Sequence, residues 1–326
     1  MDKIIGMGNA LTDVLAMLNS DELLREMNLP KGSMTLIDEK KLQSVNQYIN
    51  RMPVHMALGG SAGNSVRAMA CLGAQTGFIG KVGTDEYGDF YRKSLHERNI
   101  TDHLLLSAQL PSGVASTFIS LDGERTFGTY LGAAAAMKAT ELSLEMFKGY
   151  SYFYVEGYIV QDHDLMLRAI ELAKEAGLQV CIDLASYNIV AGERDFFGLL
   201  LNKYVDIVFA NEEEAKSFTG KEPQEALDVL GKMCSVAVVK VGAKGSLIRK
   251  GTKTVHVDAI PVSVVKDTTG AGDYFAAGFL YGLTCGFSLE KCGKIGALLA
   301  GNVIQVVGAE LTDNCWEEIK TQINSL

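Results

Sequence analysis

The stretch DTTGAGDYFAAGF, from Asp267 to Phe279, places a carboxylate directly after a glycine-rich turn and directly before a predicted helix. The turn allows the backbone amides of Gly270, Ala271 and Gly272 to converge, and the dipole of the following helix adds positive potential, so the turn suits an anion. Asp273 would repel a static anion. Its carboxylate is useful if a hydroxyl must lose its proton while attacking a phosphoryl group whose growing charge the amides stabilise. The stretch therefore predicts phosphoryl transfer to an alcohol; a capped structural loop is the alternative interpretation.

Two further glycine-rich turns carry side chains that suit a sugar. GMGNALTD follows the first predicted strand, and its Asp13 can accept hydrogen bonds from two hydroxyl groups of a diol. In LGGSAGNSVRAMACLG, Gly59 and Gly60 let a ligand approach the backbone, and Asn64 offers both a donor and an acceptor. An exposed turn aspartate and a plain loop-to-helix turn are the alternatives. A dinucleotide fingerprint is disfavoured because Leu11 occupies its third glycine position.

FANEEEA ends another predicted strand and places Asn211 and Glu214 on one face of a first helical turn. A carboxylate and an amide in this arrangement can orient the water molecules of a magnesium ion bound to phosphates. Asn followed by Glu at this spacing is also the signature of a capping box. The two roles are compatible, and both are kept as predictions.

VVKVGAKGSLI ends a further predicted strand with Lys240, Gly242 and Gly245. Such a loop can hold a nucleotide, and a tight hairpin turn uses the same residue types, so both interpretations stay open. No segment fits GxxxxGK[ST], the phosphate loop of the commonest class of nucleotide triphosphatases. If the protein handles ATP, another loop must hold the phosphates.

Short apolar runs alternate with helical patterns along most of the chain. Six runs are rich in β-branched or aromatic residues and predict buried strands: KIIGMGN, TGFIGKVG, YFYVEGY, QVCIDLA, VDIVFAN and VAVVKVG. DHDLMLRAIELAKEAG and NEEEAKSFTG predict helices between them. This order predicts an α/β fold whose parallel sheet is covered on both faces. Residues 110–131 instead alternate like a hairpin around DGER, and with residues 12–37 we expect them to form a small sheet over a cleft.

Composition narrows the class of protein. The chain has 326 residues, 48% of them hydrophobic, and can bury a large core. A net charge of −9 without any basic run argues against nucleic acid or an anionic membrane surface as the main partner. The six cysteines form no CxxC pair, and we interpret them as reduced thiols. The N-terminal residues lack the pattern of a secretory leader, so a cytoplasmic location is expected.

GGSAGNSVRAMACLG and DTTGAGDYFAAGFL resemble the two signatures of the ribokinase, or PfkB, family of carbohydrate and nucleoside kinases. GMGNALTD, FANEEEA and KVGAKGS follow the family's order and spacing, so the resemblance covers essentially the whole chain. It looks closest to the adenosine-kinase branch. The resemblance implies a ribokinase-like three-layer sandwich with a mostly parallel central sheet and a small β-sheet lid. The expected organisation is one kinase domain, residues 1–326, with lid segments at about 12–37 and 110–131.

The resemblance also implies roles for individual residues. Asp273 would be the base, and Gly270, Ala271 and Gly272 the anion hole for the transferred phosphate. The sugar would be held by Asp13, Gly59, Gly60 and Asn64. Asn211 and Glu214 would match the family's NxxE motif, which organises magnesium and phosphate. Lys240, Gly242, Gly245 and Asn302 would lie along ATP, and a monovalent cation, usually potassium, would lie near Asp267 and Thr269.

The lid of this family contributes substrate contacts and often a dimer interface, so a homodimer through the lid is an expectation. Arg125, in the turn of the lid hairpin, is able to reach a phosphate or to stay in solvent, and solvent is favoured. Substrate specificity would depend on lid side chains such as Met34, Leu36, Thr117, Phe127 and Tyr130. An apolar lining would suit a purine ring, and a smaller polar one a free sugar.

The sequence therefore predicts an ATP- and magnesium-dependent kinase that phosphorylates the primary hydroxyl of a nucleoside, with adenosine expected first. A sugar kinase of the same family, acting on ribose, fructose or a 2-keto sugar, is the main alternative. A non-catalytic nucleotide or sugar sensor is the second alternative, although it should lack the base or the NxxE pair. A nicotinamide-dependent dehydrogenase is disfavoured by the missing glycine.

Overall fold

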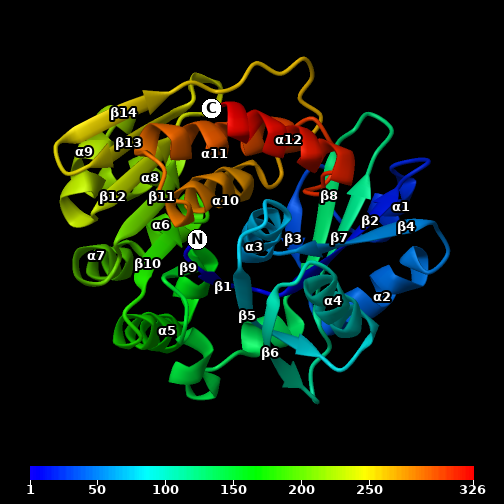
Figure 1. The fold of residues 1–326 in the computed structure, drawn as a ribbon. Helices are drawn as coiled ribbons and strands as arrows, with labels where there is room; N and C mark the ends of the chain where they lie inside the picture. The colour runs from blue at the N-terminus through cyan, green and yellow to red at the C-terminus, as the bar shows by residue number, and fades with distance from the viewer.

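A nine-stranded sheet forms the centre of the computed structural model, which describes residues 1–326 (Figure 1). All six predicted strands are confirmed: β1 Ile4–Met7, β5 Thr76–Gly83, β9 Tyr152–Glu156, β10 Gln179–Asp183, β11 Ile207–Asn211 and β12 Val236–Lys240. They pair in parallel, as the alternation of strands and helices predicts. Three strands were not predicted: the two edge strands β6 Thr101–Ser107 and β14 Lys253–Val257, and β13 Ser246–Lys250 beside β14. The strand order is β14-β13-β12-β11-β10-β9-β1-β5-β6, with β13 and β14 antiparallel to their neighbours.

Helices cover both faces of this sheet, which makes three layers (Figure 1). One hydrophobic core contains side chains of five helices: α3 Ser61–Cys71, α4 Glu86–Glu97, α10 Ala271–Thr284, α11 Leu289–Val303 and α12 Asp313–Ser325. The other contains side chains of α5 His163–Glu175, α6 Tyr187–Gly192, α7 Arg194–Lys203, α8 Glu212–Thr219 and α9 Pro223–Met233. Both predicted helices, α5 and α8, are confirmed. The strands of a sheet covered on both faces must be apolar along their whole length, which explains the continuous apolar runs in the sequence.

A second sheet of five strands packs beside the first. It contains β2 Leu11–Met17, β3 Met34–Leu36, β4 Val54–Gly59, β7 Gly113–Ile119 and β8 Arg125–Tyr130, in the order β3-β8-β7-β2-β4. The predicted hairpin is confirmed, since β7 and β8 are antiparallel neighbours, whereas β4 was not predicted. Two helices, α1 Glu22–Glu26 and α2 Glu39–Ile49, pack on one face of this sheet around a small core that includes Val14 and Phe118.

The strand register decides which side chains occupy the other, uncovered face. Asp13 pairs with Ala115, which pairs with Thr129. Because side chains alternate along a strand, the residues that share this face with Asp13 include Met34, Leu36, Thr117 and Phe127. Tyr130 does not belong to this set: it pairs with Val114 and is buried with the helix-covered core. The expectation that Tyr130 contributes to substrate specificity is therefore wrong.

Short 3₁₀ turns complete the chain: η1 Gly132–Ala136, η2 Ala139–Glu141, η3 Leu144–Phe147, η4 Gly157–Gln161 and η5 Gly242–Lys244. None of the six cysteines forms a disulfide. None of the helices combines the length and the apolar character needed to cross a bilayer.

Candidate active site

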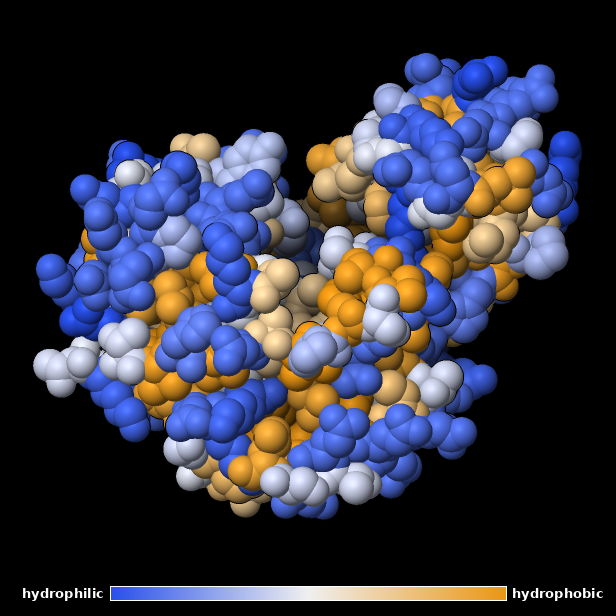
Figure 2. Space-filling view, turned by 90° about the horizontal axis from the view of Figure 1, so that it is seen from above, coloured by the Kyte–Doolittle hydropathy of each residue, from blue (hydrophilic) through white to orange (hydrophobic).

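The predicted site residues converge where the carboxyl ends of the parallel strands face the second sheet. Figure 2 shows the molecule hollowed between its main body and the smaller lobe that carries the five-stranded sheet. Ligands of open parallel sheets bind beyond the carboxyl ends of the strands, so this hollow is the expected position of a site. The first turns of α3 and α10 and the ends of β10, β11 and β12 supply its polar side chains.

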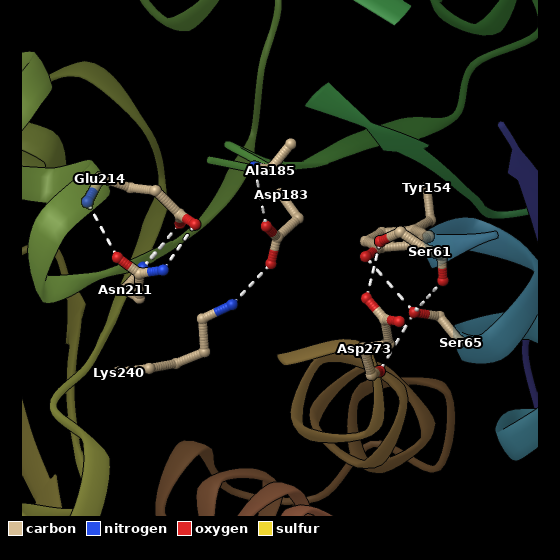
Figure 3. Close-up of polar contacts among 9 residues, drawn as sticks. All are labelled: Ser61, Ser65, Tyr154, Asp183, Ala185, Asn211, Glu214, Lys240 and Asp273. Carbon is tan, nitrogen blue, oxygen red and sulfur yellow. Dashed lines mark hydrogen bonds and ion pairs between the residues drawn. The ribbon is translucent and has the colours of Figure 1, made fainter. Parts of the chain in front are cut away.

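Asp273 lies in the first turn of α10 and is held by side chains of α3 (Figure 3). Ser61 Oγ donates to its Oδ1 over 2.6 Å, and Asn64 Nδ2 donates to its Oδ2 over 3.0 Å. Removal of the carboxylate from water raises the pKa of Asp273 to about 6, although the hydrogen bonds from Ser61 and Asn64 oppose this shift. A carboxylate with such a pKa is a competent proton acceptor at neutral pH.

The turn before Asp273 has the backbone geometry that its glycines predict. Gly270 has a φ of +76°, in the left-handed region that glycine adopts without strain. The amide of Ala271 donates to Thr268 O over 3.2 Å, while the amides of Gly272 and Asp273 have no acceptor within the chain. Lys240 adds a cation, since a Cβ at Gly272 would lie 3.1 Å from its Nζ atom. Free amides, a helix N-terminus and an ammonium group together make an anion-binding site.

Asp13 and its glycine neighbours are packed too closely for any side chain at residues 59 and 60. A Cβ at Gly59 would lie 2.2 Å from Asp13 Oδ1, and Gly60, with a φ of +80°, would bring a Cβ within 2.1 Å of Asn9 O. Burial raises the pKa of Asp13 to about 7, and Asp273 adds to the shift, while Arg67 and Arg125 oppose it. The two carboxylates of the site therefore interact electrostatically.

A buried ion pair lies between the Asp273 cluster and the end of β11 (Figure 3). Lys240 Nζ is 2.7 Å from Asp183 Oδ2, and Asp183 Oδ1 accepts the amide of Ala185 over 3.0 Å. Ala185 has a φ of +71°, a strained value for a residue with a side chain. Sequence reasoning did not single out Asp183, although the acid at the end of the run QVCID was a signal for it.

Asn211 and Glu214 form the predicted capping box. Glu214 accepts the backbone amide of Asn211 over 2.8 Å and its Nδ2 over 2.6 Å, and Asn211 Oδ1 accepts the amide of Glu214 over 2.8 Å. Glu214 is buried, and its burial together with the nearby Asp183 carboxylate raises its pKa to about 7. No group of three or more His, Cys, Asp or Glu side chains lies close enough to hold a metal ion directly.

The loop after β12 is a tight hairpin turn, which was one of the two interpretations of VVKVGAKGSLI. β12 and β13 pair in antiparallel fashion, and Val241 donates its amide to Gly245 O over 2.8 Å. A Cβ at Gly245 would lie 2.0 Å from Val257 O, so only glycine fits. Asn302 lies farther along the chain in α11, where its Nδ2 donates to Leu298 O over 2.8 Å and its Oδ1 accepts Cys315 Sγ over 3.7 Å.

Arg125 is not in solvent, and that expectation is wrong. Its side chain is only 11% exposed, because Nη1 lies 2.7 Å from Oδ2 of Asp267. The Asp267 carboxylate also accepts the amides of Thr269, over 3.0 Å, and Gly308, over 2.9 Å. Arg125 Nη1 donates to Thr269 Oγ1 over 3.4 Å as well. The turn of the β7–β8 hairpin is thus attached to the residues that precede the anion-binding turn.

Other polar residues of the site were not found by sequence reasoning. Glu156 is buried and accepts three hydrogen bonds, from the amide and Nδ2 of Asn9 at 2.8 Å each and from the amide of Ala62 at 2.9 Å. Burial raises its pKa to about 7 in spite of these donors. An acid at the end of a buried run, as in YFYVEGY, was the signal for Glu156, whereas nothing in the sequence distinguishes Ser61 or Arg67 from ordinary helix residues.

Comparison with known proteins decides the family. The family model described as pfkB family carbohydrate kinase matches residues 34–315. The chain belongs to the PfkB family. A crystal structure of a probable sugar kinase from Rhizobium etli is 33% identical, covers 98% of each chain and has a TM-score of 0.87. The crystal structure of adenosine kinase from Sinorhizobium meliloti is 32% identical, covers 99% of each chain and has a TM-score of 0.85. Adenosine kinase 2 of Arabidopsis thaliana is 26% identical over 94% of both chains.

These PfkB relatives confirm the ribokinase-like fold, with its large, mostly parallel sheet and its small second sheet. PfkB membership makes the chain a phosphotransferase of the adenosine and carbohydrate kinase class. The relatives that match over nearly the full chain include both a sugar kinase and adenosine kinases, so the family alone leaves the substrate open.

Proposed function

We propose that this protein transfers a phosphoryl group from ATP to the primary hydroxyl of a ribonucleoside, adenosine first. The observation that carries the proposal is the position of Asp273, whose carboxylate is fixed by Ser61 and Asn64 beside the free amides of Gly272 and of Asp273 itself. A base next to an anion-binding turn is what phosphoryl transfer to an alcohol requires.

In the proposed step the substrate hydroxyl gives its proton to the Asp273 carboxylate while its oxygen attacks the terminal phosphorus of ATP. The bond between that phosphorus and the bridging oxygen breaks, and ADP leaves with the electron pair. The turn Gly270, Ala271 and Gly272 stabilises charge on the transferred group mainly through the free amide of Gly272, because the Ala271 amide already donates to Thr268 O. Lys240, which lies beside Gly272, contributes a positive charge to the same space. The small sheet excludes water that would otherwise accept the phosphoryl group.

The sugar ring of the substrate is assigned to Asp13 and the turn of Gly59 and Gly60. Asp13 is available to accept hydrogen bonds from two neighbouring hydroxyl groups. The absence of side chains at residues 59 and 60 lets Asp13 and the backbone of Asn9 pack directly against this turn, which fixes Asp13 beside it. Asn64 was expected to bind the sugar, but its amide contacts Asp273 and Arg67, so its main role in this proposal is to hold the base.

The arrangement of Asn211 and Glu214 supports the binding of ATP with a magnesium ion that the protein holds through water molecules. Asn211 and Glu214 satisfy each other's hydrogen bonds, so they would orient water on the ion rather than bind it directly. Bound magnesium would neutralise charge on the phosphate oxygens. Lys240, Gly242, Gly245 and Asn302 are assigned to the nucleotide. Asp267 and Thr269 stay assigned to a monovalent cation: Oδ2 of Asp267 faces Arg125 and Gly308, whereas Oδ1 accepts only the amide of Thr269 and keeps a second acceptor position.

The lining of the small sheet favours a purine over a free sugar. Met34 and Leu36 lie on the face shared with Asp13 and are 60% and 63% exposed, and Phe127 lies beside them in the register. Three large apolar side chains side by side suit the flat surface of a purine ring, whereas a free sugar would leave them exposed to water. The similarity to the adenosine kinase from Sinorhizobium meliloti, which covers 99% of each chain, also supports a purine nucleoside as the substrate.

The experiment is a substrate panel with purified protein, ATP, magnesium and potassium, in which ADP release is measured with adenosine, other nucleosides, ribose, fructose and 2-keto sugars. Turnover with adenosine and formation of its 5′-phosphate would support the proposal. Turnover with a free sugar alone would mean that the substrate is a carbohydrate and not a nucleoside. The probable sugar kinase from Rhizobium etli, which is similar to this chain, represents that alternative. Nucleotide binding without turnover on any substrate would leave the sensor as the function.

A further inference from the structure

Arg67, in the middle of α3, is a buried cation that none of the roles above uses. Its side chain is 3% exposed and makes three polar contacts. Nη2 donates to Asn64 Oδ1 over 3.3 Å and to the backbone oxygen of Ala309, and Nη1 lies 3.7 Å from Oε1 of Glu310. Burying a guanidinium is costly unless its charge and its donors are satisfied, so this arrangement calls for a physical explanation.

The contact with Asn64 determines which way its amide points. A guanidinium has only donors, so the atom of Asn64 that faces Arg67 must be the carbonyl oxygen Oδ1. The NH₂ group then points to the opposite side, where Nδ2 donates to Oδ2 of Asp273 over 3.0 Å. The reverse orientation would place two donors against each other and two acceptors against each other. Arg67 therefore holds Asn64 in the orientation in which its NH₂ group donates to the Asp273 carboxylate, which itself only accepts.

Arg67 is itself held at a fixed place. Ala309 O, its backbone acceptor, also accepts the hydroxyl of Tyr274 over 2.7 Å, so this oxygen is tied to α10, the helix that carries Asp273. Glu310 balances the charge of Arg67 and is in turn anchored by Arg98 Nη2 over 3.1 Å and by His55 Nε2 over 2.9 Å. A side chain with partners on both sides loses its rotamer freedom, which is the requirement for orienting another group.

We infer that Arg67, fixed between Ala309 and Glu310, is a positioning residue that orients the Asn64 amide toward the base Asp273. The inference rests on the proposed phosphoryl transfer and deepens it by adding a residue that touches neither substrate nor nucleotide. Arg67 reaches Asp273 through Asn64, and its charge also lowers the pKa of Asp13.

The test is Arg67→Gln, assayed with the substrate that the panel identifies. Gln presents both a donor and an acceptor to Asn64, so the orientation of the amide then depends on Asp273 alone, and we expect kcat to fall about 10- to 100-fold while KM for both substrates changes less than about 3-fold. Arg67→Lys restores a head group with donors only and should recover much of kcat. Arg168→Gln, at an exposed arginine of α5 on the opposite face of the sheet, is the control and should leave kcat near the wild-type value.

A double-mutant cycle separates positioning from general loss of structure. Leu is close in shape to Asn, so Asn64→Leu removes the hydrogen-bond donor to Asp273 with little change in packing. On this background Arg67→Gln should have little further effect on kcat, because its route to the base is already absent. If Arg67→Gln lowers kcat by the same factor in both backgrounds, or has no effect on kcat in the wild-type background, the inference is wrong.

The pH profile of kcat gives an independent readout. Loss of the Asn64 donor should move the acid limb to higher pH, since the charged form of Asp273 loses a hydrogen bond. The ionisable groups that act on Asp273 from the surrounding elements are retained in all variants: Asp13, Tyr154, Glu156, Tyr158, Asp183 and Lys240. If Arg67→Gln does not fold, Asn64→Leu alone decides the matter, and an unchanged acid limb and kcat in that variant would refute the inference.

The kinetics of Asp273→Asn distinguish a failure of the proposed function from a failure of the role of Arg67. If Asp273→Asn keeps full turnover, Asp273 is not the base and the proposed mechanism fails, whatever Arg67→Gln does. If Asp273→Asn is inactive while Arg67→Gln and Asn64→Leu behave like wild type, the mechanism stands and only the role of Arg67 is lost.

Discussion

Ser61 Oγ donates to Oδ1 of Asp273 over 2.6 Å, although 212 residues separate the two in the sequence. The bond joins the first turns of α3 and α10, which contact each other in the core. It fixes the carboxylate of the proposed base before any substrate binds. A base held in this way does not need to reorganise during the reaction, which is the general requirement for efficient proton transfer.

Replacing Asp273 with Asn should abolish most of the turnover. The amide keeps the size of the carboxylate but cannot accept the proton of the substrate hydroxyl, so kcat should fall ~10²-fold or more. KM for ATP should change little, because the anion-binding amides remain. Steady-state kinetics measure both values, and Asp258→Asn, at an exposed aspartate outside the site, is the control. Near-wild-type turnover of Asp273→Asn would contradict the assignment.

The pH dependence of kcat/KM should show an acid limb near pH 6. The pKa of Asp273 is raised to about 6 by removal from water, and a general base must be deprotonated, so activity falls as the pH drops below that value. Ser61→Ala should move the limb to higher pH, because the Ser61 hydroxyl stabilises the charged form. Asp13 interacts with Asp273, so the observed value belongs to the pair. An acid limb at the same pH in Ser61→Ala would argue against Asp273 as the titrating group.

The pair of Arg125 and Asp267 should stabilise the attachment of the small sheet. Arg125→Met leaves a buried carboxylate without its cation, so we expect the free energy of unfolding to fall by ~3 kcal/mol. Asp267→Asn added to Arg125→Met should cost less than the sum of the two single changes. Urea unfolding measures all three variants. Arg249→Met, which breaks the more exposed pair with Asp228, is the control and should cost less than about 1 kcal/mol.

The two faces of β8 should differ in their effect on substrate. Phe127→Ala removes an apolar side chain from the face shared with Asp13, and we expect kcat/KM for adenosine to fall about 10- to 100-fold. Tyr130→Phe changes the helix-covered face and should leave kcat/KM unchanged. The same loss with ribose as substrate would show that the effect does not depend on a base.

Glu156 should make the stability of the protein depend on pH. Burial raises its pKa from the ordinary 4.5 to about 7, so the folded protein keeps this proton at pH values where the unfolded chain has released it. The contribution of Glu156 to stability is therefore greatest below about pH 4.5 and decreases as the pH rises to about 7. Glu156→Gln should become more stable relative to wild type between pH 5 and pH 8.

Chemical denaturation at these two pH values measures the difference. The exposed Glu171→Gln serves as the control and should show no such trend. A constant difference between wild type and Glu156→Gln would mean that the carboxylate is charged throughout this range.

Local features of the fold could be predicted because their physics involves neighbouring residues. The capping box of Asn211 and Glu214 needs only a spacing of three, and the turn at Gly270 needs only a residue that adopts a positive φ. The position of Tyr130 was predictable as well: it lies three residues after Phe127, and residues an odd number apart point to opposite faces of a strand. Alternation along β8 by itself therefore places Tyr130 on the face opposite Phe127.

Partners far apart in the chain could not be predicted. Arg125 is one of many charged residues near a turn, and only the packing of β8 against the start of α10 brings it to Asp267. The same holds for Lys240 with Asp183, which meet because β10 and β12 flank β11 in the sheet.

By itself, the sequence determined the sheet of parallel strands and the glycine turn before Asp273, and it led to Asp273 as the proposed base, because these depend on local backbone preference and side-chain chemistry. The tertiary structure alone decided that Ser61 and Asn64 hold Asp273, that Arg67 orients Asn64, and that the small sheet turns its apolar face to the site. The physical reason is that hydrogen bonds and ion pairs act over about 3 Å. Which side chains come that close is set by the packing of elements that lie hundreds of residues apart.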